Sequence, residues 1–192
     1  MRNAGVTKEK ILDAAMAEFS AYGIAGARVD RIAATAGCNK NLIYVYFENK
    51  ESLFITVLKK NLAYVYDKMP VLTENLPGYA ADLFDFSMAN PQLMRLLAWA
   101  NLEKQSSIYL ERADSITQKL GELAKAQRAG IASDRLSPAS LLTLILTIAT
   151  AWSAANPFGQ LINPIAQDGR DNLRQTVASA IGSLIASSPP PS

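Results

Sequence analysis

A cluster of hydrogen-bonding side chains lies in a segment whose other residues are mostly apolar. Its members are Asn39, Lys40, Asn41, Tyr44 and Tyr46. Side-chain amides, an ammonium group and phenol hydroxyls are groups that bind phosphate oxygens and the edges of bases. A helix that only completes a hydrophobic core does not need so polar an outer face. The segment therefore predicts contact with a nucleic acid.

The sequence offers few groups for catalysis or metal binding. It contains no histidine, and its only cysteine is Cys38. Histidine is the commonest general base near neutral pH, a common metal ligand and the usual partner of a reactive thiol. There is also no paired-carboxylate motif and no glycine-rich phosphate loop. We predict no catalytic residue, no metal site and no cofactor, and we interpret Cys38 as a small buried apolar residue.

Two short helices must position the polar cluster. They are expected at Val29–Ala36 and Asn39–Phe47, with Gly37 in the turn. A helix-turn-helix needs a small residue where its helices cross and a turn residue that tolerates positive φ, which Ala33 and Gly37 supply. The apolar residues expected to lock the pair are Ile32, Ala36, Cys38 and Ile43.

Two further helices are expected on either side of this pair. The preceding helix should start with Thr7 as its N-cap, after a frayed arm at residues 1–6, and stop at Gly23. The following helix should start at about residue 50, with Asn49 as its N-cap.

Prolines divide the rest of the chain. Helices are expected near residues 78–89, 91–104, 106–129, 138–155 and 170–186, with a loop at 156–169. No alternating run of β-branched residues is long enough to indicate a sheet. The sequence predicts an all-α fold with an N-terminal helix-turn-helix DNA-binding domain of three helices (1–50). A larger helical domain (51–186) and a disordered tail (187–192) follow.

Composition and charge agree with a nucleic-acid contact near the N-terminus. The 192 residues are 49% hydrophobic and 19% charged, too apolar for a disordered chain and too charged for a membrane protein. The net charge is +2, but residues 1–60 hold nine basic and six acidic groups, whereas the remaining residues hold 10 and 11. A small basic head on a nearly neutral body fits local contact with DNA.

No segment predicts export or membrane insertion. Residues 1–10 are polar and lack the apolar core of a signal peptide. The most apolar run, Leu141–Trp152, has 12 residues, three of them threonines, whereas a spanning helix needs about 20. Together with the single thiol, which suits a reducing compartment, these features predict a cytoplasmic protein without a membrane partner.

The stretch from Thr7 to Leu58 resembles the DNA-binding domain of TetR-family transcriptional regulators. The matching elements are Ile11 to Ala15 (ILDAA), Phe19, Gly23, Ile32–Ala33, Ala36–Gly37, Ile43 to Phe47 (IYVYF), Lys50–Glu51 and Leu53. The remaining two thirds resemble the family in length and helicity. The resemblance implies a sequence-specific, ligand-responsive repressor that binds a near-palindromic operator on double-stranded DNA as a homodimer. It also implies that residues 51–186 form the effector-binding and dimerisation domain.

The resemblance also implies which residues touch DNA. They are Arg28, Val29, Asn39, Lys40, Asn41, Tyr44, Tyr46 and Lys50. Residues 39–41 begin the recognition helix and reach base edges and phosphates, and the two tyrosines and the last lysine bind phosphates. The first two open the preceding helix and contact the DNA backbone.

One departure concerns the cap of that preceding helix. Many family members carry Thr or Ser at positions 27 and 28, whereas this chain has Ala27 and Arg28. The change predicts a weaker cap and a charged phosphate contact by Arg28. Arg31 and Lys10 lie outside the family pattern and are interpreted as surface residues.

Aromatic and methionine side chains in the body are candidates for an effector site. They are Phe84, Met88, Met94, Trp99, Tyr109 and Trp152. Pockets between helices are usually lined by such groups with a few polar ones, and Trp99 and Tyr109 are the strongest candidates because each carries a polar atom. Residues of this kind at helical spacing are also typical of an ordinary core. The expected ligand is an unknown small hydrophobic or amphipathic molecule.

The resemblance implies that the last two long helices pair with their copies in a second subunit. Burial within one subunit remains an alternative explanation of their apolar faces. Two further alternatives concern function. One is a helical regulator controlled by a partner protein without a small ligand, and the other is a small helical enzyme or carrier.

Overall fold

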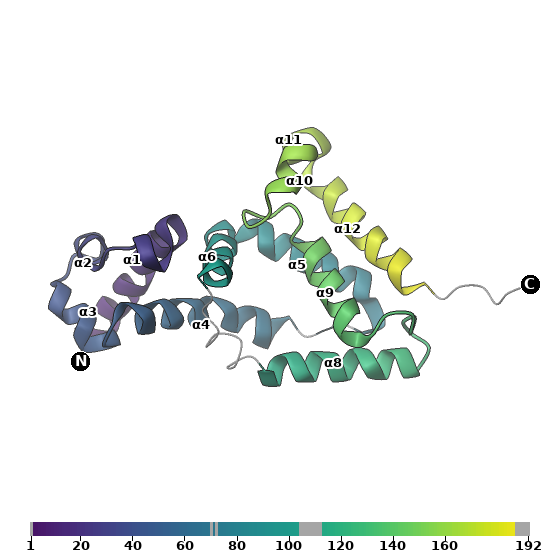
Figure 1. Cartoon of the computed structure of the whole chain (residues 1–192), viewed down its shortest axis with the longest axis horizontal. Coiled ribbons are helices and arrows are strands. Elements are labelled where there is room, and N and C mark those ends of the chain that lie inside the picture. The colour runs from purple at the N-terminus through teal and green to yellow at the C-terminus, as the bar shows by residue number, and fades with distance from the viewer. Residues whose placement is uncertain (1, 70, 72, 104–112, 187–192) are drawn as a thin grey trace, which may run out of the picture. The chain divides into compact units, whose positions relative to one another are not determined.

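The computed structural model describes residues 2–69, 71, 73–103 and 113–186, which form two compact units. Unit 1 draws on the ranges Met1–Val65 and Pro91–Leu110, and unit 2 on Tyr66–Asn90 and Glu111–Ser192. The helices that lie mainly in unit 1 are α1 (Arg2–Gly26), α2 (Val29–Ala36), α3 (Lys40–Phe47), α4 (Lys50–Lys68) and α6 (Pro91–Leu102) (Figure 1).

Unit 2 contains the remaining helices. They are the 3₁₀ turn η1 (Thr73–Asn75), α5 (Leu76–Ala89), α8 (Ala113–Arg128), α9 (Pro138–Ala149), α10 (Pro157–Ile162), α11 (Ile165–Asp168) and α12 (Arg170–Ile185). Every regular element among the described residues is a helix, which confirms the all-α expectation. The division of roles between residues 1–50 and 51–186 stays a prediction, because compact units carry no functional label.

Two phenylalanines packed edge to face lie at the centre of unit 1. Phe19 of α1 and Phe54 of α4 are both 0% exposed, and their rings meet edge to face with centroids 5.2 Å apart. Ile32 of α2 and Ile43 of α3 are also buried. All four N-terminal helices therefore contribute to one hydrophobic core, which fixes the short α2 and α3.

The first helix begins earlier than the sequence predicts. It starts at Arg2, so Thr7 lies inside α1 and is not its N-cap. Contacts from α3 explain the difference: the Tyr46 hydroxyl donates to the carbonyl of Ala4 (3.3 Å), and the Lys8 ammonium lies 5.7 Å from the ring centre of Phe47. These tertiary contacts stabilise a turn that local signals assign to a frayed arm.

The break expected at Gly23 is confirmed. Gly23 has φ 67° and ψ −177°, which interrupts the helical geometry before a last short turn to Gly26. Helix α6 packs against α1 within unit 1.

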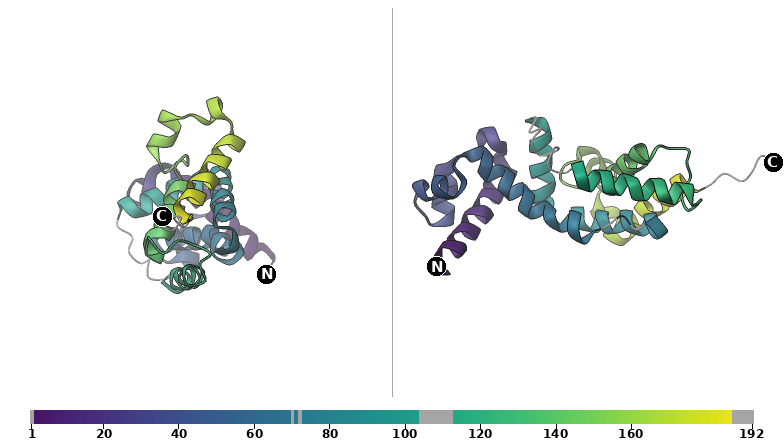
Figure 2. Two further views of the ribbon diagram at one scale, coloured as in Figure 1. Left: turned by 90° about the vertical axis from the view of Figure 1, so that its right-hand side faces the viewer. Right: turned by 90° about the horizontal axis from the view of Figure 1, so that it is seen from below.

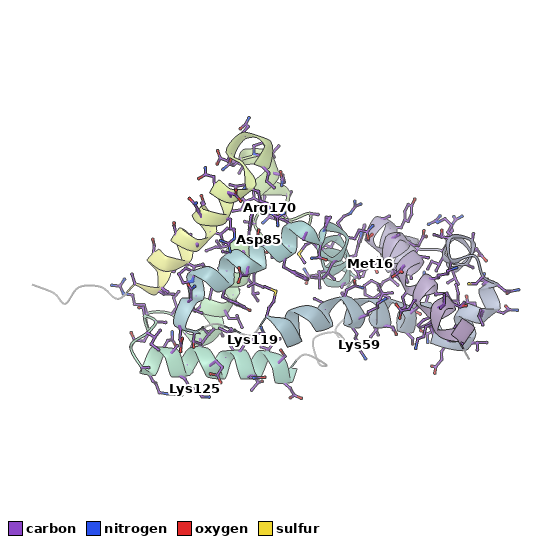
Figure 3. All side chains as sticks on the ribbon, turned by 180° about the vertical axis from the view of Figure 1, so that it is seen from behind. Met16, Lys59, Asp85, Lys119, Lys125 and Arg170 are labelled. Carbon is purple, nitrogen blue, oxygen red and sulfur yellow. The ribbon has the colours of Figure 1, made fainter. Side chains whose placement is uncertain are left out.

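Helix α5 is central to unit 2, where it packs against α9 and α12. On the α12 side, Asp85 accepts hydrogen bonds from Arg170 (3.1 Å) and Arg174 (2.6 Å), and Asp82 accepts from Arg174 (2.9 Å). Figure 3 labels Asp85 and Arg170 on these two helices. Buried apolar residues of α9 and α12 complete the core, namely Leu141, Leu142, Ile145, Ala149, Leu173, Val177 and Ile181.

Two expectations for the last third of the chain are wrong. The helix predicted for 138–155 ends at Ala149, and the loop predicted for 156–169 contains α10 and α11. A physical reason for the second error is that a proline can begin a helix, because its missing N–H is not needed in the first turn. Asn156 is extended and its side chain caps α10 at the amide of Phe158 (2.9 Å), directly before Pro157.

The bounds of the other body helices agree better with the predicted ranges. Helices α5, α6 and α12 lie close to the predicted ranges. The helix predicted for 106–129 is seen as α8 from Ala113, and its first residues lie outside the described part of the chain. The tail predicted for 187–192 also lies outside the described residues.

Candidate DNA-binding surface

The turn between α2 and α3 has the geometry expected of a helix-turn-helix. Gly37 adopts φ 66° and ψ 38°, and its amide donates to the carbonyl of Ala34 (3.2 Å). The amide of Cys38 donates to the carbonyl of Ala33 (3.0 Å). These two bonds form a Schellman motif, which ends α2 sharply and uses the left-handed conformation that glycine tolerates.

Apolar residues lock α2 against α3 as predicted. Ile32, Ala36 and Ile43 are at most 8% exposed, and Ala33 is also buried. Cys38 is only half-buried, so it lies at the margin of this lock and not within it. A small side chain in the turn has fewer neighbours than one on either helix.

Three side chains project from the outer face of α3. Asn41 and Tyr44 are exposed, as is Val45, which is 76% exposed. Within the described residues the side chains of Asn41 and Tyr44 form no hydrogen bond that would have to be broken before they bind a ligand. Sequence analysis missed Val45, although an exposed valine beside two polar groups is suited to contact a thymine methyl group.

Other predicted contact residues are engaged within the protein. The Asn39 carboxamide caps α3 by accepting from the Asn41 amide (2.8 Å). The Tyr46 hydroxyl bonds to the N-terminal turn of α1, and the Lys50 ammonium donates to the carbonyl of Ala27 (3.2 Å). These bonds fix the side chains close to the surface that α3 exposes, but a new partner must share or replace them.

Lys40 forms an ion pair on the surface. Its ammonium lies 2.9 Å from a carboxylate oxygen of Asp30 on α2. The hydrogen bond from this carboxylate, together with its charge, raises the pKa of Lys40 above the ordinary lysine value. Both side chains are well exposed, so a phosphate can displace Asp30 at small cost.

The start of α2 presents one free charge. Arg28 is exposed at the N-cap position and its side chain makes no capping hydrogen bond. Val29 is 8% exposed, so its side chain belongs to the core and only its backbone amide can reach a DNA phosphate. Residue 28 therefore supplies no side-chain cap for α2, which agrees with the weaker cap that the sequence predicts.

A buried carboxylate on α1 holds this segment instead, and sequence analysis missed it. Glu18 is 9% exposed and accepts hydrogen bonds from the Arg28 amide (2.8 Å) and from Nε of Arg31 (2.8 Å). Arg31 also donates to the carbonyl of Gly26 (3.1 Å) and lies 4.4 Å from the ring centre of Tyr22. Arg31 is thus a partly exposed surface residue, as predicted, that also has a structural role.

The ionisation of Glu18 depends on these contacts. Burial alone would raise the pKa of its carboxyl group, but the hydrogen bonds from Arg31 and the Arg28 amide, with the charge of Arg31, bring the pKa below the ordinary value. A carboxyl group with a lowered pKa stabilises the folded state above its unfolded pKa of about 4.3 and loses this effect as the pH falls through the folded pKa.

We expect Glu18→Gln to lower the free energy of unfolding at pH 7 by about 1–3 kcal/mol, because a charged acceptor of buried hydrogen bonds is lost. The difference from the wild type should shrink as the pH falls from the unfolded pKa of about 4.3 through the lowered pKa of Glu18 in the folded state, where Glu18 itself becomes protonated. Urea denaturation across this pH range measures the effect, with Glu74→Gln as an exposed control. Equal stability of Glu18→Gln and wild type at pH 7 would contradict this role.

The predicted effector residues are divided between the two units. Phe84 and Met88 on α5 lie in unit 2 with Trp152, whereas Met94 and Trp99 on α6 lie in unit 1. Tyr109 lies outside the described residues.

Within unit 2, the rings of Phe84 and Trp152 meet edge to face with centroids 6.3 Å apart. The indole N–H of Trp152 donates to the carbonyl of Asn163 (3.0 Å).

Two further features bear on the class of protein. In the described residues, no helix is both long and apolar enough to cross a membrane. The same residues contain no group of three or more His, Cys, Asp or Glu side chains arranged to hold a metal ion.

Comparison with known families decides what the helix-turn-helix belongs to. Residues 11–57 match the model described as bacterial regulatory proteins, tetR family. Residues 75–182, more than half of the chain, match the tetracyclin repressor-like C-terminal domain. The chain belongs to the TetR family of transcriptional regulators.

Relatives of this TetR-family regulator span nearly its whole length. It is 35% identical over 188 residues to the HTH-type transcriptional repressor SCO4008 of Streptomyces coelicolor, a match that covers 96% of this chain and 97% of the relative. The HTH-type transcriptional regulator RutR of Escherichia coli is 28% identical over 163 residues, 82% of this chain and 76% of the relative.

A solved structure shares the fold. The crystal structure of the transcriptional regulator SCO4942 from Streptomyces coelicolor aligns with a TM-score of 0.81 and 34% identity, over 93% of this chain and 98% of that one. Family and relatives together establish a DNA-binding transcriptional regulator.

Proposed function

We propose that the protein is a ligand-responsive repressor that binds a near-palindromic operator as a homodimer. The observation that carries the proposal is the outer face of α3, where Asn41, Tyr44 and Val45 are exposed together. The opposite face of α3 is locked against α2, so these side chains are held on a rigid element. A rigid helix with a mixed polar and apolar face suits the major groove of DNA.

The contacts divide into two kinds. We assign base reading to Asn41 and Val45, because an amide can pair with adenine and a valine can contact the thymine methyl group. We assign phosphate binding to Arg28, Tyr44 and Lys50. Phosphate contacts fix the register of the protein on the duplex without reading its sequence.

The remaining predicted contacts support this arrangement. Asn39, as the cap of α3, orients the amides at the start of the recognition helix. Lys40 and Tyr46 reach phosphates after exchanging their internal partners, and the amide of Val29 binds the backbone at the start of α2.

A homodimer would place two recognition helices on one face of the DNA. Their separation would be about 34–36 Å, the distance between successive major grooves. We assign the subunit interface to α9 and α12, because some of their apolar residues are not buried within unit 2. Leu146 of α9 is 42% exposed, and Leu184 and Ile185 of α12 are half-buried.

We place the effector, a small hydrophobic or amphipathic molecule, beside Phe84, Met88 and Trp152 in unit 2. Such an effector must favour the state that does not bind DNA, because a ligand with equal affinity for both states shifts nothing. A compound that releases DNA should change the tryptophan fluorescence of the wild type more than that of Trp152→Phe. The same change in both proteins would contradict this location.

The salt dependence of operator binding tests the phosphate contacts. We expect Lys50→Ala to weaken binding to every sequence and to reduce the salt slope by about one per subunit, because one phosphate contact is lost. Lys125→Ala is the matched control: it removes the same charge from α8, where the lysine pairs with Glu122 (2.9 Å). A Lys50→Ala slope equal to that of the wild type would overturn the assignment.

A further inference from the structure

The break in α1 is closed by a carboxylate from α6. Glu103 follows the last residue of α6, and its amide donates to the carbonyl of Trp99 (2.9 Å), which continues the last helical turn. Its two carboxylate oxygens accept hydrogen bonds from the amides of Ile24 (3.0 Å) and Ala25 (3.2 Å). Helices α1 and α6 pack against each other within unit 1 (Figures 1 and 2).

These two amides need an acceptor from elsewhere. Gly23 departs from helical geometry, so the turn after it starts anew and its first amides lack carbonyl partners four residues earlier. A carboxylate at such a position is favoured by both hydrogen bonding and the helix dipole. Glu103 therefore acts as the cap of the last turn of α1, although it lies 79 residues from Ile24.

Gly23 allows this contact to be close. A Cβ atom at this position would lie 2.6 Å from Oε1 of Glu103 and 2.9 Å from Cε3 of Trp99. With its positive φ of 67°, the position is restricted both by conformation and by space. The end of α6 thus fits against a glycine that no larger residue could replace without displacing Glu103 or the indole.

The capped turn leads directly into the DNA-binding helices. Residues 27 and 28 are the only ones between α1 and α2, and the amide of Arg28 is held by Glu18. The direction of α2 is consequently fixed on both sides of this short connection. Glu103, directly after α6, holds the end of α1, and Glu18 of α1 holds the start of α2. Since α3 is locked to α2, the same contacts orient the recognition helix relative to α6.

We propose that Glu103 is a positioning residue for DNA binding: by capping the break at Gly23, it sets the orientation of the helix-turn-helix and therefore the spacing of the two recognition helices. The part of this inference that concerns spacing rests on the proposed homodimer. Glu103 does not touch DNA in this account. It acts through α1 and α2. Its loss should therefore weaken binding to a complete operator, which needs both helix-turn-helix motifs of the dimer, more than binding to a half-site, which needs one.

The test compares a complete operator, selected from random DNA, with a duplex that carries one half-site. For Glu103→Ala and Glu103→Gln we expect binding to the complete operator to weaken about tenfold, as loss of a hydrogen bond to a charged acceptor warrants. Half-site binding should stay within about twofold, because the α3 surface is unchanged. The variants should also tolerate altered half-site spacings that the wild type rejects. Glu122→Gln, on α8, is the charge-matched control.

Hydrogen exchange supplies a readout that does not depend on DNA. The amides of Ile24 and Ala25 should exchange faster in both Glu103 variants, whereas those of the α2–α3 turn should keep their wild-type rates. Glu103→Gln keeps the size of the side chain and serves if Glu103→Ala does not fold.

The outcomes separate the two levels of the proposal. An equal loss of affinity for complete operator and half-site, or unchanged exchange at both amides, would overturn the role of Glu103. If the wild-type protein bound complete operator and half-site equally well, the homodimer itself would be refuted, and the spacing role with it.

Discussion

Phe54→Ala is expected to lower the free energy of unfolding of unit 1 by about 3–5 kcal/mol, the usual cost of replacing a buried phenylalanine by alanine. Phe54 is fully buried and its ring packs edge to face against Phe19, so the substitution leaves a cavity between α1 and α4. In a chain of this size the melting temperature should fall by about 6–20 °C. The affinity for the operator should also fall, because α2 and α3 contribute buried residues to this core.

Tyr44→Ala is the control for this experiment. It also removes an aromatic ring, but Tyr44 is 41% exposed on α3, so the melting temperature should change little. Calorimetry and operator binding are measured on both variants. The structure predicts that Tyr44→Ala loses affinity without losing stability, whereas Phe54→Ala loses both. A Phe54→Ala protein with the same melting temperature as the wild type would show that this core does not stabilise unit 1.

Asn41→Ala is expected to remove sequence discrimination. A bidentate amide–adenine pair contributes about 1–3 kcal/mol, so a dimer with two half-sites should lose about 2–6 kcal/mol on its preferred operator. Binding to non-operator DNA should hardly change, because the amide carries no charge. Alanine is also a good helix former, and the fold of α3 should be retained.

The measurement is a competition between the operator and duplexes that carry each alternative base pair. Discrimination should disappear at one position of each half-site and persist at the others. Gln118→Ala, which removes an exposed amide from α8 in unit 2, provides the control. Equal losses on operator and non-operator DNA would mean that Asn41 binds the backbone and does not read a base.

The helix-turn-helix could be predicted closely from the sequence because its determinants are local. Val29–Ala36 follows from apolar spacing, and Gly37 provides the left-handed residue that the turn requires. Asn49 is the N-cap of α4 as expected, since its side chain accepts from the amide of Ser52 (2.7 Å). Signals of this kind act within a few residues, so tertiary contacts rarely overrule them.

The contacts that orient this motif could not be predicted. Glu18 reaches Arg28 across 10 residues, and Glu103 reaches Ile24 across 79. Nothing in the sequence around Glu18 or Glu103 distinguishes these two residues from ordinary surface glutamates. The hydrogen bonds formed by Lys50 and Tyr46 were hidden for the same reason, since each depends on how helices pack.

The candidate effector residues show a different limit of prediction from sequence. Aromatic spacing indicates which face of a helix is apolar but not which neighbour covers it. For example, spacing alone could not predict that the indole of Trp99 packs against Gly23 within unit 1. Likewise, Pro157 was interpreted as part of a loop, whereas it occupies the first turn of α10.

Selection of bound DNA from a random pool tests the central claim most directly. The account predicts that the wild-type protein enriches a near-palindrome whose half-sites are centred about 10–10.5 base pairs apart, or a multiple of that distance. Two α3 helices related by twofold symmetry would read such a sequence. Recovery of DNA with no common sequence, or of a single half-site without its inverted copy, would contradict the account.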